Sequence, residues 1–217
     1  MLASSRPTRR RPDDARAHVG RAQRRALSRR RILDAASAAL TEGDDTRFTV
    51  RDIAARANVS PGLVMQHFGS MADLVLEVFM EANADLDVQL AAAAGGADPR
   101  ARTLAAFRWL MQRDLDRPLL SGRMMAFAWT WSGTQEERFQ EGVQALTRRL
   151  VQLLDDPARA TPASAREAAA TALIAIYNVN LRRAVTAGYS ADEAMKRMTA
   201  SFDVVLDGLA AQVKKSV

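Results

Sequence analysis

The chain has 217 residues, a formal net charge of +6 and no cysteine. This length allows a substantial hydrophobic core, and the lack of cysteine excludes disulfides, thiolate zinc sites and cysteine nucleophiles. No apolar run approaches the roughly 18 to 20 residues of a membrane span, and the arginine-rich start lacks the apolar segment of a secretory signal. We therefore expect a cytoplasmic protein that does not bind membranes.

Positive charge is concentrated at the N-terminus. Residues 1–31 contain 11 arginines and two aspartates, a net charge of +9, whereas the remaining residues sum to −3. A basic segment on a mildly acidic body is typical of proteins that bind a polyanion, with nucleic acid favoured over anionic lipid. Residues 1–24 have two prolines and few large apolar side chains, so we expect a disordered basic arm. A solvated tail without a specific partner is the simpler alternative.

The rest of the chain has helical periodicity and no strand signal, which predicts an all-α fold. Residues 25–41 have one apolar face and an arginine-rich opposite face. Thr49 with Asp52, and Ser60 with Pro61, are start signals for two short helices that end near residues 57 and 67. Ser70 starts a long helix towards residue 93. Further helices are expected at about 99–116, 118–131, 134–155, 163–187 and 191–213.

Two short helices joined by a tight turn, after a longer supporting helix, form a helix-turn-helix, whose second helix enters the DNA major groove. In that second helix Val64 and Phe68 are four residues apart and face inward, so the opposite side projects outward. We expect an N-terminal three-helix helix-turn-helix DNA-binding domain at residues 25–75. A larger helical ligand-binding and dimerisation domain is expected at residues 76–217.

Four segments in this region resemble the N-terminal signature of the TetR family of transcriptional regulators. They are Arg31-Ile-Leu-Asp-Ala-Ala, Phe48-Thr-Val-Arg-Asp-Ile-Ala, Asn58-Val-Ser-Pro-Gly and His67-Phe-Gly-Ser, in the family's order and at its separations. The similarity extends from residue 28 to 77, while the rest resembles the family only in length and helical character. It implies a dimeric regulator whose C-terminal part varies with the ligand. We expect by default a repressor that binds a palindromic operator and is released by a small apolar or aromatic effector.

The resemblance also implies roles for single residues. Thr49 and Arg51 contact phosphate, Ser60 caps the recognition helix, and Gly62 lets its backbone approach DNA. Gln66 is the best candidate for base readout, because an amide can bond both groups that adenine presents in the major groove. The expected DNA-binding residues are Arg31, Thr49, Arg51, Ser60, Gly62, Leu63, Met65, Gln66 and His67.

Three residues depart from the family pattern. Leu63 and Met65 stand where many members have Thr and Tyr, so base contacts there are expected to be apolar. Met71 stands where Lys is common, which removes a phosphate contact. The basic arm compensates if its arginines enter an adjacent minor groove.

The second region contains most of the large aromatic and methionine side chains. Residues 119–131 are apolar nearly all round, which predicts a helix buried on every side. Such residues are more often core than pocket, but methionine beside aromatic rings also suits a cavity for a small ligand. Asn178 and Asn180 either orient such a ligand or bond across a subunit interface. The expected ligand-binding residues are Phe107, Met111, Met124, Phe127, Trp131, Tyr177 and Asn178.

The last two expected helices each have an apolar stripe. An intramolecular core explains one stripe, whereas two adjacent ones favour a homodimer with a four-helix interface. The stripe of the final helix consists of Met195, Met198, Phe202, Val205 and Leu209. That of the preceding helix consists of Ala168, Ala169, Ala172, Leu173, Ile176 and Leu181.

The chain is not expected to be an enzyme. Its two histidines, His18 and His67, are far apart in the sequence, so neither a metal site nor a catalytic triad is indicated, and no cofactor is expected. The remaining alternative is an architectural protein that binds DNA without sequence preference through its arm. Equal affinity for random and promoter DNA at fixed salt would favour that alternative.

Overall fold

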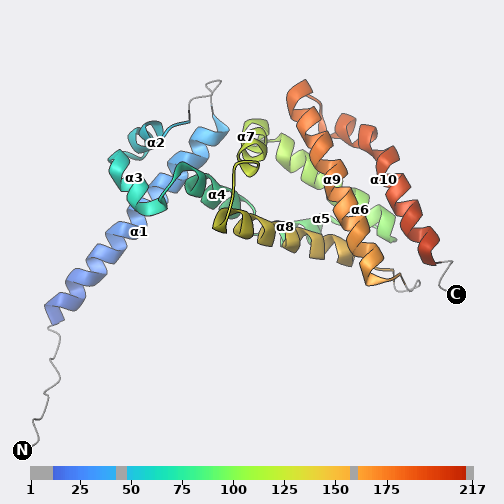
Figure 1. Ribbon diagram of the computed structural model, residues 1–217, viewed down its shortest axis with the longest axis horizontal. Coiled ribbons are helices and arrows are strands. Elements are labelled where there is room, and N and C mark those ends of the chain that lie inside the picture. Colours follow the sequence, from blue (N-terminus) through green and yellow to red (C-terminus); the bar gives the residue numbers. More distant parts are fainter. Residues whose placement is uncertain (1–11, 43–47, 157–160, 214–217) are drawn as a thin grey trace, which may run out of the picture.

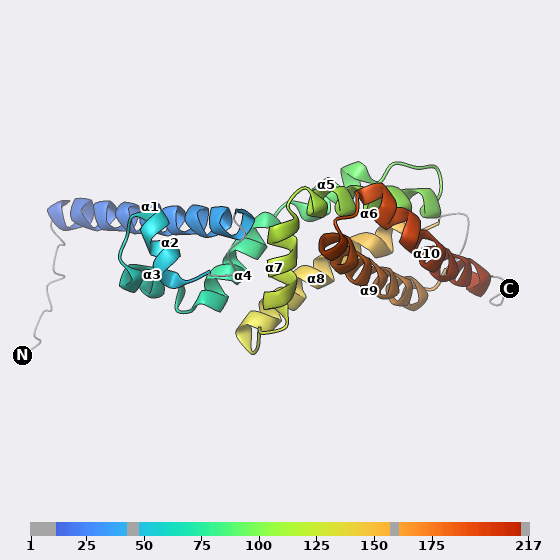
Figure 2. The ribbon, with the colours of Figure 1, turned by 90° about the horizontal axis from the view of Figure 1, so that it is seen from above.

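The computed structural model describes residues 12–42, 48–156 and 161–213. Within these ranges the chain folds into ten α-helices and no strands, which confirms the predicted all-α class with one helix more than expected. The molecule is elongated, with α1 to α4 at one end and α9 and α10 at the other (Figures 1 and 2). The helices are α1 (Pro12–Thr41), α2 (Val50–Ala57), α3 (Pro61–Phe68), α4 (Met71–Ala82), α5 (Leu86–Ala93), α6 (Pro99–Leu115), α7 (Pro118–Ala128), α8 (Thr134–Leu153), α9 (Ala163–Ala187) and α10 (Ala191–Val213).

The first helix begins earlier than expected. Residues 12–24 were assigned to a disordered arm but form the start of α1, whereas residues 1–11 of that arm lie outside the described residues. Proline is tolerated in the first turn of a helix, so Pro12 does not prevent this start. The alanines and arginines that follow are strong helix formers. Low hydrophobicity alone was therefore a poor guide to disorder here.

The N-terminal core lies between α1, α2, α3 and α4. Ile32, Ile53 and Leu74 have no exposed surface, and burying each such side chain contributes roughly 1.5–3 kcal/mol. The core also includes Leu120, Met124 and Trp131, which come from α7 and the turn after it. Side chains from both sides of the expected boundary at residue 75 thus share one core.

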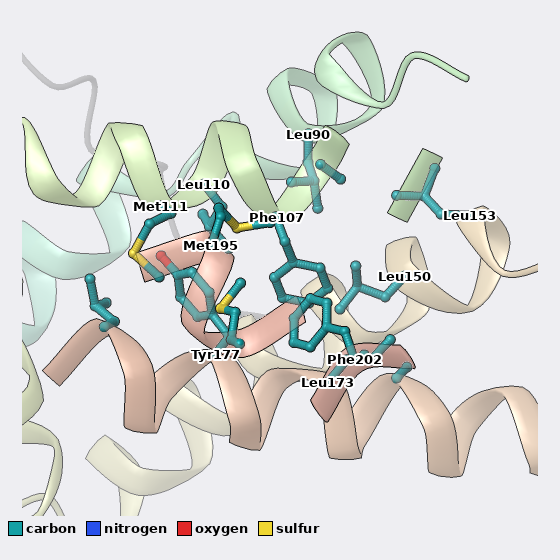
Figure 3. Packing of buried hydrophobic residues seen from close by; sticks show 14 of the residues in the cluster. Leu90, Phe107, Leu110, Met111, Leu150, Leu153, Leu173, Tyr177, Met195 and Phe202 are labelled. Carbon is teal, nitrogen blue, oxygen red and sulfur yellow. The ribbon is translucent and has the colours of Figure 1, made fainter. Parts of the chain in front are cut away.

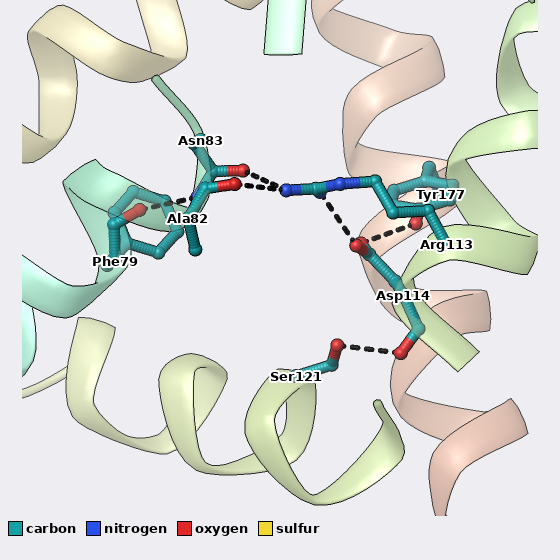
Figure 4. Close-up of polar contacts among 7 residues, drawn as sticks. All are labelled: Phe79, Ala82, Asn83, Arg113, Asp114, Ser121 and Tyr177. Carbon is teal, nitrogen blue, oxygen red and sulfur yellow. Dashed lines mark hydrogen bonds and ion pairs between the residues drawn. The ribbon is translucent and has the colours of Figure 1, made fainter. Parts of the chain in front are cut away.

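The helix expected over residues 71–93 is two helices, α4 and α5. Asn83 follows the last residue of α4, and its Nδ2 donates to the carbonyl oxygen of Phe79 at 2.8 Å. Arg113 of α6 donates to the carbonyl oxygen of Ala82 at 2.6 Å and to Asn83 Oδ1 at 3.1 Å (Figure 4). These bonds satisfy a carbonyl that the end of α4 leaves without a helical partner.

The C-terminal core is centred on Phe107 of α6 (Figure 3). Its ring centroid lies 4.7 Å from that of Phe202 and 5.5 Å from that of Tyr177. Met195, Met198 and Phe202 are buried in this core, so the centre of the stripe on α10 packs inside the chain. The stripe is therefore not available as the expected dimer seam. The same core buries Ala169, Leu173 and Leu181 of the expected α9 stripe.

Residues 119–131 do not form a helix buried on every side. The helix α7 ends at Ala128, and Leu119 and Trp129 are 41% and 90% exposed. Buried Leu120 and Met124 face the N-terminal core instead. Hydrophobic composition was mistaken for burial, although single exposed apolar residues are common on protein surfaces.

Among the described helices, none is by itself both long and apolar enough to cross a membrane. Only α3 and the segment Met71–Ala93 taken together have the length and apolar composition of a span, and these two are bent by 65° relative to each other.

Candidate nucleic-acid interface

The two short helices and their turn are defined by local capping. Thr49 precedes α2, and its hydroxyl accepts a hydrogen bond from the Asp52 amide while Asp52 accepts one from the Thr49 amide at 3.1 Å. Asn58 ends α2 with φ 52°, a left-handed conformation that Asn tolerates better than most residues. Ser60 starts α3 by accepting from the Leu63 amide at 3.2 Å. The predicted caps of both helices are confirmed.

Arg31 of α1 holds the turn between α2 and α3 in place. Its Nη2 donates to the carbonyl oxygens of Ala57 at 2.5 Å and Asn58 at 2.9 Å, the last carbonyls of α2. A cation at a helix C-terminus is also favoured by the helix dipole. The structure thus gives this expected DNA-binding residue a role inside the domain.

The helix α3 has one buried and one outward side. Val64 and Phe68 are 1% and 8% exposed and anchor it on the N-terminal core. Met65 and Gln66 are exposed, whereas Leu63 is half-buried. The expected division of α3 into an anchoring side and a projecting side is therefore present, with Leu63 at the border between them.

Gly62 lies in the exposed first turn of α3. A Cβ atom at this position would meet only the Ser60 hydroxyl oxygen, at 4.0 Å. Its φ is not in the left-handed region, and alanine is the better helix former by about 0.8–1 kcal/mol. The fold therefore does not require glycine at this position.

Cations surround the C-terminal end of α3. The pKa of His67 is lowered by burial and then by the nearby charges of Arg25 and Arg29 of α1. The guanidinium carbon of Arg29 lies 5.0 Å from the ring centroid of Phe68. Arg51 at the start of α2 is exposed and forms no ion pair with the carboxylates described. The exposed side of α3 thus lies beside positive charge and contains no acidic residue.

The expected ligand-binding residues do not form one group. Phe107, Met111 and Tyr177 lie in the C-terminal core. Asn178 is exposed on α9, so it does not face them. The other three, Met124, Phe127 and Trp131, pack in or against the N-terminal core.

A partly buried polar cluster was missed by the sequence analysis. Asp114 Oδ2 accepts a hydrogen bond from the Tyr177 hydroxyl at 2.8 Å, and Asp114 Oδ1 pairs with Arg113 at 3.0 Å (Figure 4). Burial raises the pKa of Asp114 despite these donors, and burial with the Asp114 charge raises the pKa of Tyr177 well above its usual value. The adjacent Arg-Asp pair looks like ordinary helix surface in the sequence, so only the partner on α9 reveals the cluster.

Among the described residues, five buried side-chain polar atoms lack a hydrogen-bond partner. Two of them belong to uncharged side chains: the hydroxyl of Thr103, which has no exposed surface, and the indole nitrogen of Trp131. A buried polar group without a partner costs about 1–3 kcal/mol. No sequence signal marked Thr103.

Comparison with known proteins agrees with this geometry. Residues 32–78, from α1 into α4, match the model of the family described as "Bacterial regulatory proteins, tetR family". No curated protein matches the sequence.

Solved structures share the fold. A TetR transcriptional regulator from Rhodococcus sp. RHA1 has a TM-score of 0.67 at 19% identity, covering 83% of this chain and 96% of that one. A tetR-family regulator from Streptomyces coelicolor has a TM-score of 0.68 at 15% identity, covering 87% and 84%. NalD, the secondary repressor of the MexAB-OprM multidrug efflux pump in Pseudomonas aeruginosa, has a TM-score of 0.56 at 19% identity, covering 85% and 94%. Residues 32–78 of the chain thus match the tetR family of bacterial regulatory proteins, and the chain as a whole has the fold of these solved regulators.

Proposed function

We propose that this regulator binds a specific operator through the outward side of α3 and represses transcription until an effector binds. The observation that supports this most directly is Gly62, a glycine that the fold does not need on the side of α3 that faces away from the core. Close approach of a DNA backbone explains the absence of a side chain there. We assign adenine readout to exposed Gln66 and contact with a thymine methyl group to exposed Met65.

Phosphate contacts come from the residues that border α3. We assign them to Thr49 and exposed Arg51 at the start of α2, and to His67 at the end of α3. The basic residues of α1 add to this surface, since Arg21 and Arg25 are exposed and α1 extends beyond α3 (Figure 1). A helical arm is too wide for a minor groove, so these arginines are assigned to the phosphates beside it.

We propose that two copies pair through the outward faces of α9 and α10 rather than through the buried stripes. Small or apolar residues are exposed on both helices and permit close helix packing: Ala168, Ala175 and Val179 on α9, and Ala200, Val204 and Gly208 on α10. A twofold dimer would present two α3 helices about 34 Å apart, one turn of DNA.

The proposed effector site is the part of the C-terminal core where Phe107, Met111 and Tyr177 meet. Thr103 and Asp114 supply the polar groups there, one unsatisfied and one already paired with Tyr177. A ligand that displaced Tyr177 from Asp114 would disturb Arg113, which binds the end of α4. If the effector binds the conformation that does not fit the operator more tightly by roughly 1.4 kcal/mol, operator affinity falls tenfold.

The first test is selection of operator DNA. Purified full-length protein is mixed with fragmented genomic DNA, and recovered fragments are compared with random DNA at fixed salt. We expect a shared palindromic sequence and much tighter binding than to random DNA. Equal affinity for both would instead establish the architectural alternative.

A second measurement assigns the specificity to α3. Gln66→Ala should weaken operator binding by about 1–3 kcal/mol and relax the preference at one base pair of each half-site. The matched control is Gln89→Ala, since Gln89 is an exposed glutamine of α5 outside the interface. Equal behaviour of the two variants would remove Gln66 from the proposal.

A further inference from the structure

We propose that Arg123 of α7 holds the DNA-binding helices at a fixed angle to the rest of the chain, and thereby determines which spacing of operator half-sites the dimer accepts. This role rests on the proposed function, because it requires a dimer that binds a palindromic operator. Arg123 lies on α7, outside the proposed DNA contacts on α1, α2 and α3, so it acts as a positioning residue.

The guanidinium group of Arg123 binds the end of α1. Its Nη1 donates to the carbonyl oxygens of Ala39 at 2.7 Å and Leu40 at 3.0 Å, and the carbonyl oxygen of Glu42 lies 3.3 Å from the same nitrogen. Because α1 ends at Thr41, these carbonyls are among those that a helix end leaves without backbone partners. The partial negative charge of a helix C-terminus also favours a cation there.

The same side of α7 packs on the N-terminal core. Leu120 and Met124 are each 7% exposed and belong to that core. The ring centroid of Phe127 lies 6.2 Å from that of Phe48, in an edge-on arrangement. Apolar contacts are not directional, whereas a hydrogen bond weakens steeply when its angle is distorted. The bonds of Arg123 therefore specify an orientation that the apolar contacts leave open.

Another side of α7 packs on the C-terminal helices. Gly122 lies so close to α9 that an added Cβ would be 3.3 Å from Val185 Cγ1. The Ser121 hydroxyl donates to the carbonyl oxygen of Asp114 of α6 at 2.8 Å. Figure 2 shows α7 between α1 and α4 on one side and α9 on the other. Since α9 is part of the proposed subunit interface, α7 connects that interface to the DNA-binding helices.

Other polar contacts attach the C-terminal helices to α4. Gln135 of α8 donates through Nε2 to Asp73 Oδ1 at 2.8 Å, and Arg138 of α8 pairs with Glu77 at 2.8 Å. A group of helices attached through one member can still turn about it, whereas attachment through both α1 and α4 prevents this rotation. Loss of the Arg123 bonds therefore allows more orientations of the DNA-binding helices without removing a proposed contact between α3 and DNA.

The spacing of half-sites reports this orientation. One extra base pair between two half-sites moves one of them by roughly 3.4 Å along the DNA axis and turns it by roughly 35°. A dimer with rigidly held DNA-binding helices accepts one spacing. A dimer with more freedom binds the correct spacing less tightly, because more conformational freedom is lost on binding, and it tolerates the altered spacing better.

The test measures fluorescence anisotropy of the full chain with three labelled duplexes. These are the selected operator, the same operator with one base pair added at its centre, and a single half-site. The parent should bind the selected operator far more tightly than the lengthened one. Arg123→Gln should lower this ratio of affinities by about tenfold, the fold-change for loss of one charge-assisted hydrogen bond. Its affinity for the single half-site should equal that of the parent.

Two further variants complete the comparison. Arg123→Lys keeps a cation at the end of α1 but lacks the planar fork of arginine, so its ratio should lie between those of the parent and Arg123→Gln. Arg148 is an exposed arginine of α8, and Arg148→Gln should keep the ratio of the parent. Circular dichroism and sedimentation verify that each variant is folded and dimeric. If Arg123→Gln does not fold, Arg123→Lys decides the question.

The outcomes separate this role from the proposed function. A ratio equal to that of the parent in Arg123→Gln, or in Arg123→Lys where that variant decides, overturns the role of Arg123 alone. An equal loss of affinity for all three duplexes also overturns it, because Arg123 would then only stabilise the fold. A parent that binds its selected operator no more tightly than random DNA refutes the proposed function and this role together.

Discussion

Arg113 of α6 donates a 2.6 Å hydrogen bond to the carbonyl oxygen of Ala82, the last residue of α4. The same guanidinium pairs with Asp114, which accepts from Tyr177 of α9. The helix α4 also supplies Leu74 and its neighbours to the core that anchors α3. One continuous series of polar contacts therefore joins the C-terminal core to the helix beneath the proposed DNA-binding surface.

The first prediction follows from this series. Arg113→Ala should lower the free energy of unfolding by about 1–3 kcal/mol, because it leaves the partly buried carboxylate of Asp114 without its cation. The pKa of Asp114 is already raised by burial, so its charged form is disfavoured in the folded state and stability is lost as pH rises through that pKa. The decrease in the free energy of unfolding caused by Arg113→Ala should therefore be larger at neutral pH than at pH 4. Urea denaturation at the two pH values measures this difference.

The control for this prediction is Arg148→Ala, which removes an exposed arginine of α8. It should change stability by less than about 0.5 kcal/mol at both pH values. A destabilisation of Arg113→Ala that did not depend on pH would show that Asp114 is not the affected group.

The second prediction concerns Gly62→Ala. The variant should be as stable as the parent or up to about 1 kcal/mol more stable, because alanine favours the helix and its Cβ meets only Ser60 at 4.0 Å. Operator affinity should nevertheless fall by about tenfold or more, roughly 1.4 kcal/mol, if the DNA backbone approaches this residue. Thermal unfolding and fluorescence anisotropy with labelled operator provide the two readouts.

A matched variant is Gly142→Ala in α8, where an added Cβ also meets a single side-chain atom, Met80 Sδ, at 4.0 Å. It should not change operator affinity. If Gly62→Ala bound DNA as tightly as Gly142→Ala, close approach at residue 62 would be refuted.

The third prediction concerns pH and DNA binding. Burial and the charges of Arg25 and Arg29 lower the pKa of His67, so the free protein has a neutral imidazole at pH 7. A phosphate beside His67 would raise that pKa, so binding would take up a proton and operator affinity should rise as pH falls from 7.5 to about 6. His67→Gln should abolish most of this dependence. An unchanged pH profile in the variant would place His67 away from phosphate.

Local signals explain why the helix-turn-helix could be predicted. The caps at Thr49, Ser60 and Ser70 each involve a residue three positions later, so the sequence alone contains both partners. The inward placement of Val64 and Phe68 follows from helical period in the same way. Helix starts and the division of α3 into two sides were therefore accessible without coordinates.

Distant partners explain what could not be predicted. The end of α4 depends on Arg113, which lies thirty residues beyond Asn83 in the sequence. Phe202 has the spacing of an intersubunit seam, but its partner is Phe107 of the same chain. Periodicity identifies a buried face and does not say which element covers it. The expected ligand-binding set was divided between two cores for the same reason.

The fourth prediction concerns the link between domains made by Glu77 of α4. Its Oε2 pairs with Arg29 of α1 at 2.5 Å and its Oε1 with Arg138 of α8 at 2.8 Å. Burial disfavours its charge, but the two arginines outweigh that effect and lower the pKa of Glu77. The stabilisation by ionised Glu77 is therefore fully present above pH 4.5, the ordinary pKa of a glutamate. It is lost as the pH falls through the lowered pKa of Glu77.

Replacing Glu77 with Gln should remove this part of the acid sensitivity. The parent should lose thermal stability more steeply than Glu77→Gln between about pH 5 and 3, whereas at pH 7 the variant should be less stable by about 1 kcal/mol. Glu137→Gln, which changes an exposed glutamate of α8, is the control and should follow the parent. Parallel curves for parent and Glu77→Gln would contradict the assignment.

The last prediction separates the two sides of α10. Val204 is 74% exposed in the single chain, whereas Phe202 is fully buried against Phe107. Val204→Asp should therefore dissociate the proposed dimer while leaving the fold of each chain intact, because the introduced charge is solvated in the monomer and desolvated in the interface. Phe202→Ala should instead lower the free energy of unfolding by about 3–5 kcal/mol. Sedimentation and thermal unfolding distinguish these outcomes, and a fully dimeric Val204→Asp would move the subunit interface away from this face.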